Sequence, residues 1–204
     1  MDGEIIGCSI SDRVLSKTKY VNHVSRQVTG FVKIGNTTES VEINTEVIIL
    51  PDGGQIIPYF KDGKGRWKIV LVSQYRPAVK EKTIEGAGGR LDGESPEIAL
   101  SRELEEETKI KVDPRDIKMA FREYSNPSIV SSDVYGGIIK ISAKIVKNKK
   151  WAGKRSENER TRIEIFDLVE ILNKRENGKI MIDLVTSHLI DYVAKAVGLL
   201  VKKY

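Results

Sequence analysis

The stretch GGRLDGESPEIALSRELEEETKI, residues 88–110, joins a glycine-rich turn to a strongly acidic helix pattern. Ser95 is a residue type that caps helix N-termini, and Pro96 suits the first helical position. These signals predict a helix from Ser95 to about Lys109. The glycine-rich residues 86–89 lie just before it, where backbone without side chains can approach other groups closely.

Three carboxylates of this helix share one face. A helix turns ~100° per residue, so Glu103, Glu106 and Glu107 lie together while Glu105 points nearly opposite. Each like-charged pair at this spacing costs roughly a few tenths of a kcal/mol unless a cation neutralises it. Two explanations stay open. Acidic runs usually form solvated surfaces, whereas clustered carboxylates beside an exposed backbone carbonyl also suit Mg²⁺ or Mn²⁺, and such a site serves phosphate chemistry.

The spacing of these residues resembles the Nudix box, G-xxxxx-E-xxxxxxx-R-E-U-x-E-E-x-G-U, where U is a bulky apolar residue. The matching residues are Gly88, Glu94, Arg102, Glu103, Leu104, Glu106, Glu107 and Ile110. Lys109 stands where the box has glycine, at the helix exit, where a left-handed residue is common. The chain is therefore identified as a member of the Nudix hydrolase family.

Two further segments are similar to the ADP-ribose pyrophosphatase branch of that family: SQYRPAV at residues 73–79 and EGAG at residues 85–88. The resemblance implies an α/β fold, a Nudix-type α/β/α sandwich with a mixed β-sheet over residues 54–204, plus a small N-terminal antiparallel β-sheet domain over residues 1–53. It also implies hydrolysis of ADP-ribose to AMP and ribose 5-phosphate. The alternatives are another nucleotide sugar, such as GDP-mannose or a UDP-sugar, and a catalytically weak Nudix-fold protein that senses nucleotides.

The resemblance further implies a divalent-metal site, with Mg²⁺ expected, Mn²⁺ as its substitute and two or more ions per site. The ligands would be the carbonyl of Ala87 and the carboxylates of Glu103, Glu106 and Glu107. Arg102 would orient these glutamates. Its alternative role is a surface ion pair with Glu106, one helical turn away.

Substrate contacts are expected from Arg76, Glu85 and Gly88. The planar fork of Arg76 suits phosphate recognition, although an ion pair at a strand end is the alternative. The resemblance places the general base in a charged loop, on Glu157, which would deprotonate the attacking water. The alternative is that this charged loop is a solvated surface segment without a catalytic role. The other acidic candidates for the base are Glu159 and Asp133.

The composition excludes several other classes of function. With 34 basic and 29 acidic residues among 204, the surface is mixed, so nucleic-acid binding is not expected despite the net charge of +5. No apolar run approaches the roughly 18 residues of a membrane span, and no secretory signal is visible, which predicts a cytoplasmic protein without membrane contact. One cysteine and two histidines leave the chemistry mostly to carboxylates.

The rest of the chain shows alternating and amphipathic patterns. His188 lies on the apolar face of the last predicted helix, so we expect a buried core histidine there. The predicted elements are an antiparallel sheet over about residues 25–50, a hairpin of residues 55–60 and 67–75, strands at residues 117–123, 134–146 and 163–167, a helix from about Leu168, and a last helix from Leu184 to Leu200.

The N-terminal β segment is too small to bury both of its faces alone, because two- or three-stranded sheets need a partner surface. The resemblance implies that this partner is a second subunit. In the expected homodimer the segment crosses the two-fold axis and reaches the other chain's active site.

Overall fold

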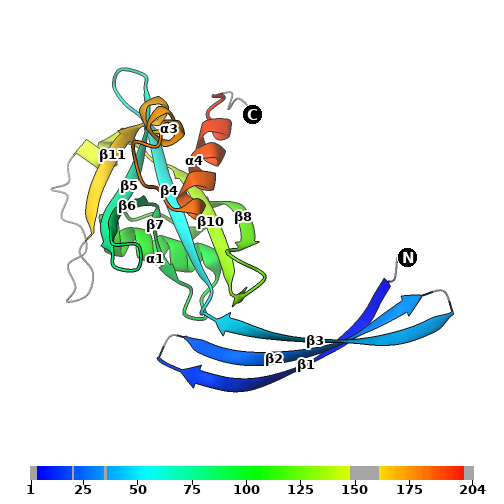
Figure 1. Cartoon of the computed structure of the whole chain (residues 1–204). Coiled ribbons are helices and arrows are strands. Elements are labelled where there is room, and N and C mark those ends of the chain that lie inside the picture. The colour runs from blue at the N-terminus through cyan, green and yellow to red at the C-terminus, as the bar shows by residue number, and fades with distance from the viewer. Residues whose placement is uncertain (1–3, 20, 35, 148–160, 200–204) are drawn as a thin grey trace. The chain divides into compact units, whose positions relative to one another are not determined.

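The computed structural model describes residues 4–19, 21–34, 36–147 and 161–199. The chain forms two compact units (Figure 1). The small unit comprises Met1–Pro51 and Tyr124–Asp133, and the main unit comprises Asp52–Glu123 and Val134–Tyr204.

The small unit is a four-stranded sheet in the order β1-β2-β3-β9. Its strands are β1 (Glu4–Lys17), β2 (Asn22–Ile34), β3 (Thr37–Ile49) and β9 (Val130–Ser131). The first three pair antiparallel in chain order, and β9 pairs in parallel with β3. The sheet predicted over residues 25–50 lacked β1, because Asp12 interrupts the alternation of Ile10 and Val14 with a charge.

The main unit contains a mixed sheet with the central order β11-β5-β4-β10-β8. Its strands are β4 (Gly53–Lys61), β5 (Trp67–Arg76), β6 (Glu81–Glu85), β7 (Ala87–Arg90), β8 (Lys118–Tyr124), β10 (Asp133–Lys140) and β11 (Arg162–Asp167). β4 lies antiparallel to β5 and parallel to β10, while β11 lies antiparallel to β5. Two short strands add to the two central strands: β6 pairs antiparallel with β5, and β7 pairs antiparallel with β4.

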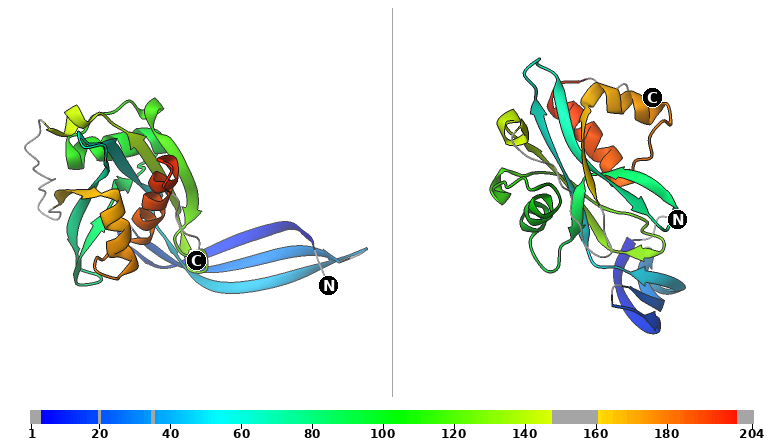
Figure 2. Two further views of the ribbon diagram at one scale, coloured as in Figure 1. Left: turned by 90° about the horizontal axis from the view of Figure 1, so that it is seen from above. Right: turned by 90° about the vertical axis from the view of Figure 1, so that its left-hand side faces the viewer.

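Helices cover both faces of this sheet (Figure 2). They are α1 (Pro96–Thr108), the 3-10 helix η1 (Pro114–Asp116), α2 (Ala143–Lys147), α3 (Leu168–Glu176) and α4 (Leu184–Ala196). Ile56 of β4 packs in one buried cluster with Leu100 of α1. The next residue, Ile57, packs in the other cluster with Leu189 of α4. Because successive strand residues point to opposite faces, this confirms the α/β/α sandwich and explains the continuous apolar runs of the central strands.

Three predictions about the main unit were wrong. The last helix, predicted to run from Leu184 to Leu200, ends at Ala196. The strand predicted over residues 134–146 ends at Lys140, and the short helix α2 follows. Its first turn is favoured by Ser142, whose Oγ accepts a hydrogen bond from the Lys144 amide at 3.3 Å. His188 is not a core residue: its side chain is 44% exposed, and its Nδ1 lies 3.3 Å from Glu123 Oε2. Helical periodicity alone could not reveal this partner on β8.

In the described ranges, no helix is long and apolar enough to cross a membrane.

Candidate active site

Local signals at both ends of α1 define where its carboxylates lie. At the N-terminus, the Oγ of Ser95 accepts a hydrogen bond from the Ile98 amide at 3.5 Å. At the C-terminus, Lys109 has a left-handed φ of 59°, and its amide donates to the Glu105 carbonyl at 2.9 Å. Lys109 thus makes the exit turn for which the box pattern has glycine, at a conformational cost of about 1–2 kcal/mol.

Glu103 and Glu107 lie one helical turn apart and face the glycine-rich strand β7. Both are buried, at 8% and 4% exposure. Glu107 Oε2 accepts a hydrogen bond from the Gly88 amide at 3.1 Å. A Cβ at Gly89 would lie only 2.4 Å from Glu103 Oε1. The glycines therefore allow two carboxylates to approach the backbone, which a strand with side chains would prevent.

Arg102 connects the acidic residues around this pair. Its Nε donates to Glu94 Oε2 at 2.8 Å, and its Nη1 donates to Glu103 Oε1 at 2.7 Å. The Nη1 atom also lies 3.5 Å from Glu106 Oε1. Hydrogen bonds to Glu94 and Glu103 raise the pKa of Arg102 against the opposing effect of its partial burial. Arg102 thus pairs with Glu94 and Glu103 and also lies near Glu106, so both the expected contact with the glutamates and the alternative pair one helical turn away are present.

The donor atoms of this face suit a divalent cation. Glu103 and Glu107 supply hard carboxylate oxygens, and the buried Ala87 is the first residue of the adjacent strand. Glu106 lies at the rim, with a side chain that is 41% exposed and near Arg102. Among the described residues, no group of three acidic, histidine or cysteine side chains is arranged so that it could hold a metal ion. Glu103 and Glu107 thus face β7, while Glu106 shares the guanidinium of Arg102 with Glu103.

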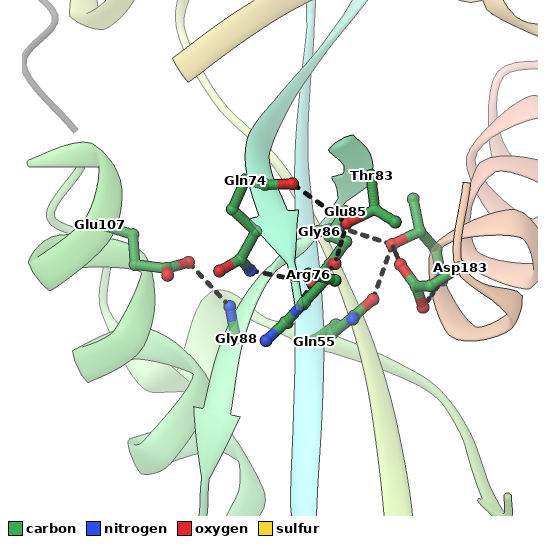
Figure 3. Close-up of polar contacts among 10 residues, drawn as sticks. Gln55, Gln74, Arg76, Thr83, Glu85, Gly86, Gly88, Glu107 and Asp183 are labelled. Atoms are coloured by element: carbon green, nitrogen blue, oxygen red, sulfur yellow. Dashed lines mark hydrogen bonds and ion pairs between the residues drawn. The ribbon is translucent and has the colours of Figure 1, made fainter. Parts of the chain in front are cut away.

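Arg76 and Glu85 form an ion pair next to this face (Figure 3). Arg76 Nε donates to Glu85 Oε1 at 2.8 Å, and its Nη2 donates to the other carboxylate oxygen. Glu85 also accepts hydrogen bonds from Thr83 Oγ1 at 2.5 Å and from Gln74 Nε2 at 3.0 Å. Burial alone would raise the pKa of Glu85, but these hydrogen bonds and the charge of Arg76 outweigh it, so the pKa lies below its ordinary value. Glu85 is thus a buried, ionised group that orients Arg76.

A second polar cluster, which the sequence did not predict, lies behind this pair and is formed by Gln55, Asp183 and Thr186. Thr186 is fully buried, and its Oγ1 accepts a hydrogen bond from the Gly86 amide at 2.6 Å. The hydroxyl lies 2.5 Å from Asp183 Oδ2 and 2.7 Å from Gln55 Oε1. Burial, together with the nearby charge of Glu85, raises the pKa of Asp183 against the hydrogen bonds of Thr186. The only sequence signal was Asp183 as a helix N-cap residue type.

Comparison with known proteins identifies the family of this fold. The model of the NUDIX domain matches residues 54–182. The chain belongs to the Nudix family. It is also 32% identical over 102 residues to the ADP-sugar pyrophosphatase of Mus musculus, a match that covers 50% of this chain and 47% of the mouse protein. The chain therefore spans about half the length of this curated relative.

The Nudix match gives the described site a family context. Nudix hydrolases generally use divalent metal ions. α1 carries the Nudix box, and β7 carries its first glycine, Gly88. Asp183 and Thr186 lie beyond the matched residues 54–182. The expected general base, Glu157, and its alternative Glu159 lie outside the described residues, while Asp133 belongs to the small unit.

Proposed function

We propose that this Nudix protein hydrolyses the diphosphate bond of a nucleoside diphosphate sugar, with ADP-ribose, cleaved to AMP and ribose 5-phosphate, as the preferred substrate. The observation that carries the proposal is the pair Glu103 and Glu107, both buried against the glycine strand, with Glu107 bonded to the Gly88 amide and Glu103 bonded to Arg102. A nucleotide-binding sensor has no need to keep two carboxylates in this place. The name of the mouse relative, an ADP-sugar pyrophosphatase, supports the substrate class.

The proposed cofactor is Mg²⁺, with Mn²⁺ as a substitute, in two or more positions. Glu103, Glu106, Glu107 and the carbonyl of Ala87 would hold it. When bound, such ions neutralise a diphosphate and lower the pKa of a coordinated water. Arg102 would keep Glu103 correctly oriented, because its guanidinium donates directly to that carboxylate.

Arg76 is proposed to bind the diphosphate. Its side chain remains 46% exposed while it is bonded to the buried Glu85, so the guanidinium is held in one orientation yet remains accessible. Preorganised arginine groups stabilise the charge that grows on phosphoryl oxygens in the transition state. Glu85 and the Gly88 backbone complete the proposed substrate contacts.

The proposed general base is Glu157. A loop carboxylate can approach the metal site and accept the proton of the attacking water once substrate is bound, provided that it comes within about 3 Å. The water oxygen would then attack phosphorus, and the nucleoside monophosphate would leave.

A homodimer is proposed from the small unit. Register places Ile10 of β1, Val28 of β2 and Ile43 of β3 in one row across the sheet, and a second row contains Val14, Val24 and Val47. Four-residue spacing puts both rows on the same face. In the single chain Ile10, Val14 and Ile43 are more than half exposed, whereas Val24 and Val47 of the second row are buried. An apolar face of this kind suits an isologous contact with a second copy.

A substrate panel tests the proposed function. The full chain is incubated with Mg²⁺ and with ADP-ribose, GDP-mannose or a UDP-sugar, and release of the nucleoside monophosphate is measured. We expect ADP-ribose to give the highest kcat/KM. Higher turnover of another nucleotide sugar would reassign the base and sugar only. Tight binding of ADP-ribose without turnover of any substrate would favour the sensor instead.

A further inference from the structure

We infer that Thr186 is a positioning residue of the active site, an inference that rests on the proposed function. Its hydroxyl holds the amide of Gly86, and with it the short segment that joins the substrate side of the site to the metal side. Asp183 holds Thr186 in turn.

The segment needs an anchor because the sheet changes partner at this point. Glu85, the last residue of β6, pairs with Val72 of β5, whereas Ala87, the first residue of β7, pairs with Ile56 of β4. Gly86 lies between the two ladders and donates its amide to Thr186 Oγ1 at 2.6 Å rather than to a strand. A buried amide without this acceptor would be costly, which makes the hydroxyl the anchor of the crossover.

Thr186 itself is held firmly in the first turn of α4. The carboxylate of Asp183 uses both oxygens on it: Oδ1 accepts the Thr186 amide at 3.1 Å, and Oδ2 lies 2.5 Å from the hydroxyl. Gln55 of β4 lies 2.7 Å from the same hydroxyl. A hydroxyl has one proton and two lone pairs. It can therefore accept from Gly86 while donating to one of the two acceptors, Asp183 Oδ2 or Gln55 Oε1, so the hydroxyl links the crossover to the N-terminus of α4 or to β4 (Figure 3).

The position of the crossover at Gly86 affects both halves of the site. On one side, Glu85 accepts a hydrogen bond from the guanidinium of Arg76. On the other side, the Gly88 amide donates to Glu107 at 3.1 Å. Consecutive Cα atoms are held ~3.8 Å apart. A shift at Gly86 therefore displaces Glu85 on one side and, through Ala87, Gly88 on the other. A misplacement of about 1 Å can cost 10²-fold in rate.

The experiment compares Thr186→Val with Thr186→Ser in the full chain with Mg²⁺ and ADP-ribose. Valine keeps the volume and removes the hydroxyl, and we expect kcat to fall about 10- to 100-fold, with a smaller change in KM. Serine keeps the hydroxyl and should restore kcat to within about 3-fold, a rescue that packing alone does not explain. Ser187→Ala is the matched control: it removes the neighbouring hydroxyl of α4, which bonds to Arg175 at 3.1 Å, and kcat should stay unchanged.

Amide hydrogen exchange provides a second readout that needs no activity. The Gly86 amide should exchange at least about 10-fold faster in Thr186→Val than in the wild type, because its buried acceptor is gone. If Thr186→Val does not fold, Asp183→Asn takes its place; asparagine keeps the N-cap, and we expect a kcat about 3- to 10-fold below wild type.

The outcomes separate this inference from the proposed function. Wild-type kcat in a folded Thr186→Val protein, or in Asp183→Asn if valine is not tolerated, would overturn the inference alone. Equal losses in the valine and serine variants would also overturn it, since the hydroxyl would then not be the active group. A wild-type chain that neither hydrolyses nor binds any nucleotide sugar would refute the proposed function, and this inference with it.

Discussion

The two sheets of this protein are built from similar β-branched residues but bury them to very different degrees. In the main unit, Ile56 and Ile57 are 0% exposed, because helices cover both faces of the sheet. In the small unit, Ile10 and Ile43 are 58% and 56% exposed. A sheet covered on both faces gives a close-packed frame that can hold carboxylates in fixed positions. On this face of the small unit Val24 and Val47 are buried, but the exposed row of Ile10 and Ile43 is suited to association. Variants in the main unit should therefore change kcat, and variants in the small unit should change assembly and KM.

The largest effect is expected from Glu157→Gln, which removes the proposed base and leaves the metal ligands of the main unit in place. The rate should fall by about 10²- to 10⁴-fold, with unchanged Mg²⁺ affinity, as measured by initial rates and metal titration. Glu159→Gln is the matched control. If Glu159→Gln causes the loss and Glu157→Gln does not, the base is Glu159.

The next largest effect is expected from Glu107→Gln. This change keeps the size of the side chain and its contact with Gly88, but removes the charge of a buried metal ligand. We expect kcat to fall by about 10²- to 10³-fold, with the thermal unfolding midpoint nearly unchanged. Glu105→Gln, on the exposed side of the same helix, should have little effect. Wild-type turnover of Glu107→Gln in saturating Mg²⁺ would remove Glu107 from the proposed ligands.

Local signals explain which parts of this comparison could be predicted from the sequence. The start of α1 was predictable because Ser95 acts within one helical turn of its partner, whereas the left-handed exit turn is made by Lys109, where the box pattern has glycine. The contact between Thr186 and Gly86 joins residues 100 positions apart, and no spacing rule links them. The ion pair of Arg76 with Glu85 was considered only as a general alternative for Arg76, since the sequence does not reveal that β5 and β6 pair there.

Dimerisation should fail when the apolar face of the small unit is altered. A chain starting at Gly54 should be a monomer of lower mass and bind ADP-ribose more weakly, by about 10-fold in KM, because an isologous contact can lend side chains to the neighbouring site. Ile43→Lys should have the same effect in the full chain, since an exposed position tolerates the change within about 0.5 kcal/mol. Val169→Lys, at a 51% exposed position of the main unit, is the control.

Light scattering provides the measurement. The wild type should scatter at twice the single-chain mass of 22.9 kDa. The Ile43→Lys variant should scatter at the single-chain mass, with kcat preserved. A fully active wild-type chain of 22.9 kDa would rule the dimer out.

The smallest effect is expected from the charge pair within the apolar face of the small unit. Asp12 of β1 accepts two hydrogen bonds of 2.8 Å from Arg26 of β2, and the two residues stand opposite each other between the two apolar rows. The hydrogen bonds from Arg26 hold the pKa of Asp12 below its ordinary value of 3.8. A lowered carboxyl pKa means that the folded state favours the ionised form. The pair therefore stabilises the sheet above pH 3.8, and this contribution is lost as the pH falls through the lowered pKa.

Asp12→Asn should weaken the dimer only a few-fold at pH 7, because the charge of Arg26 is then placed on the contact face without its partner. Analytical ultracentrifugation at a series of pH values measures this, and the difference between variant and wild type should shrink as the pH falls through the lowered pKa of Asp12, where Asp12 itself becomes protonated. Asp113→Asn is the matched control: Asp113 forms a similar exposed pair with Arg115 in the main unit, which lowers its pKa to about 2. This control should leave the dimer unchanged at every pH. Equal weakening by both variants would mean that general surface charge, rather than the Asp12 and Arg26 pair, governs association. The Asp12 and Arg26 pair would then not distinguish the associating sheet of the small unit from the sheet of the main unit.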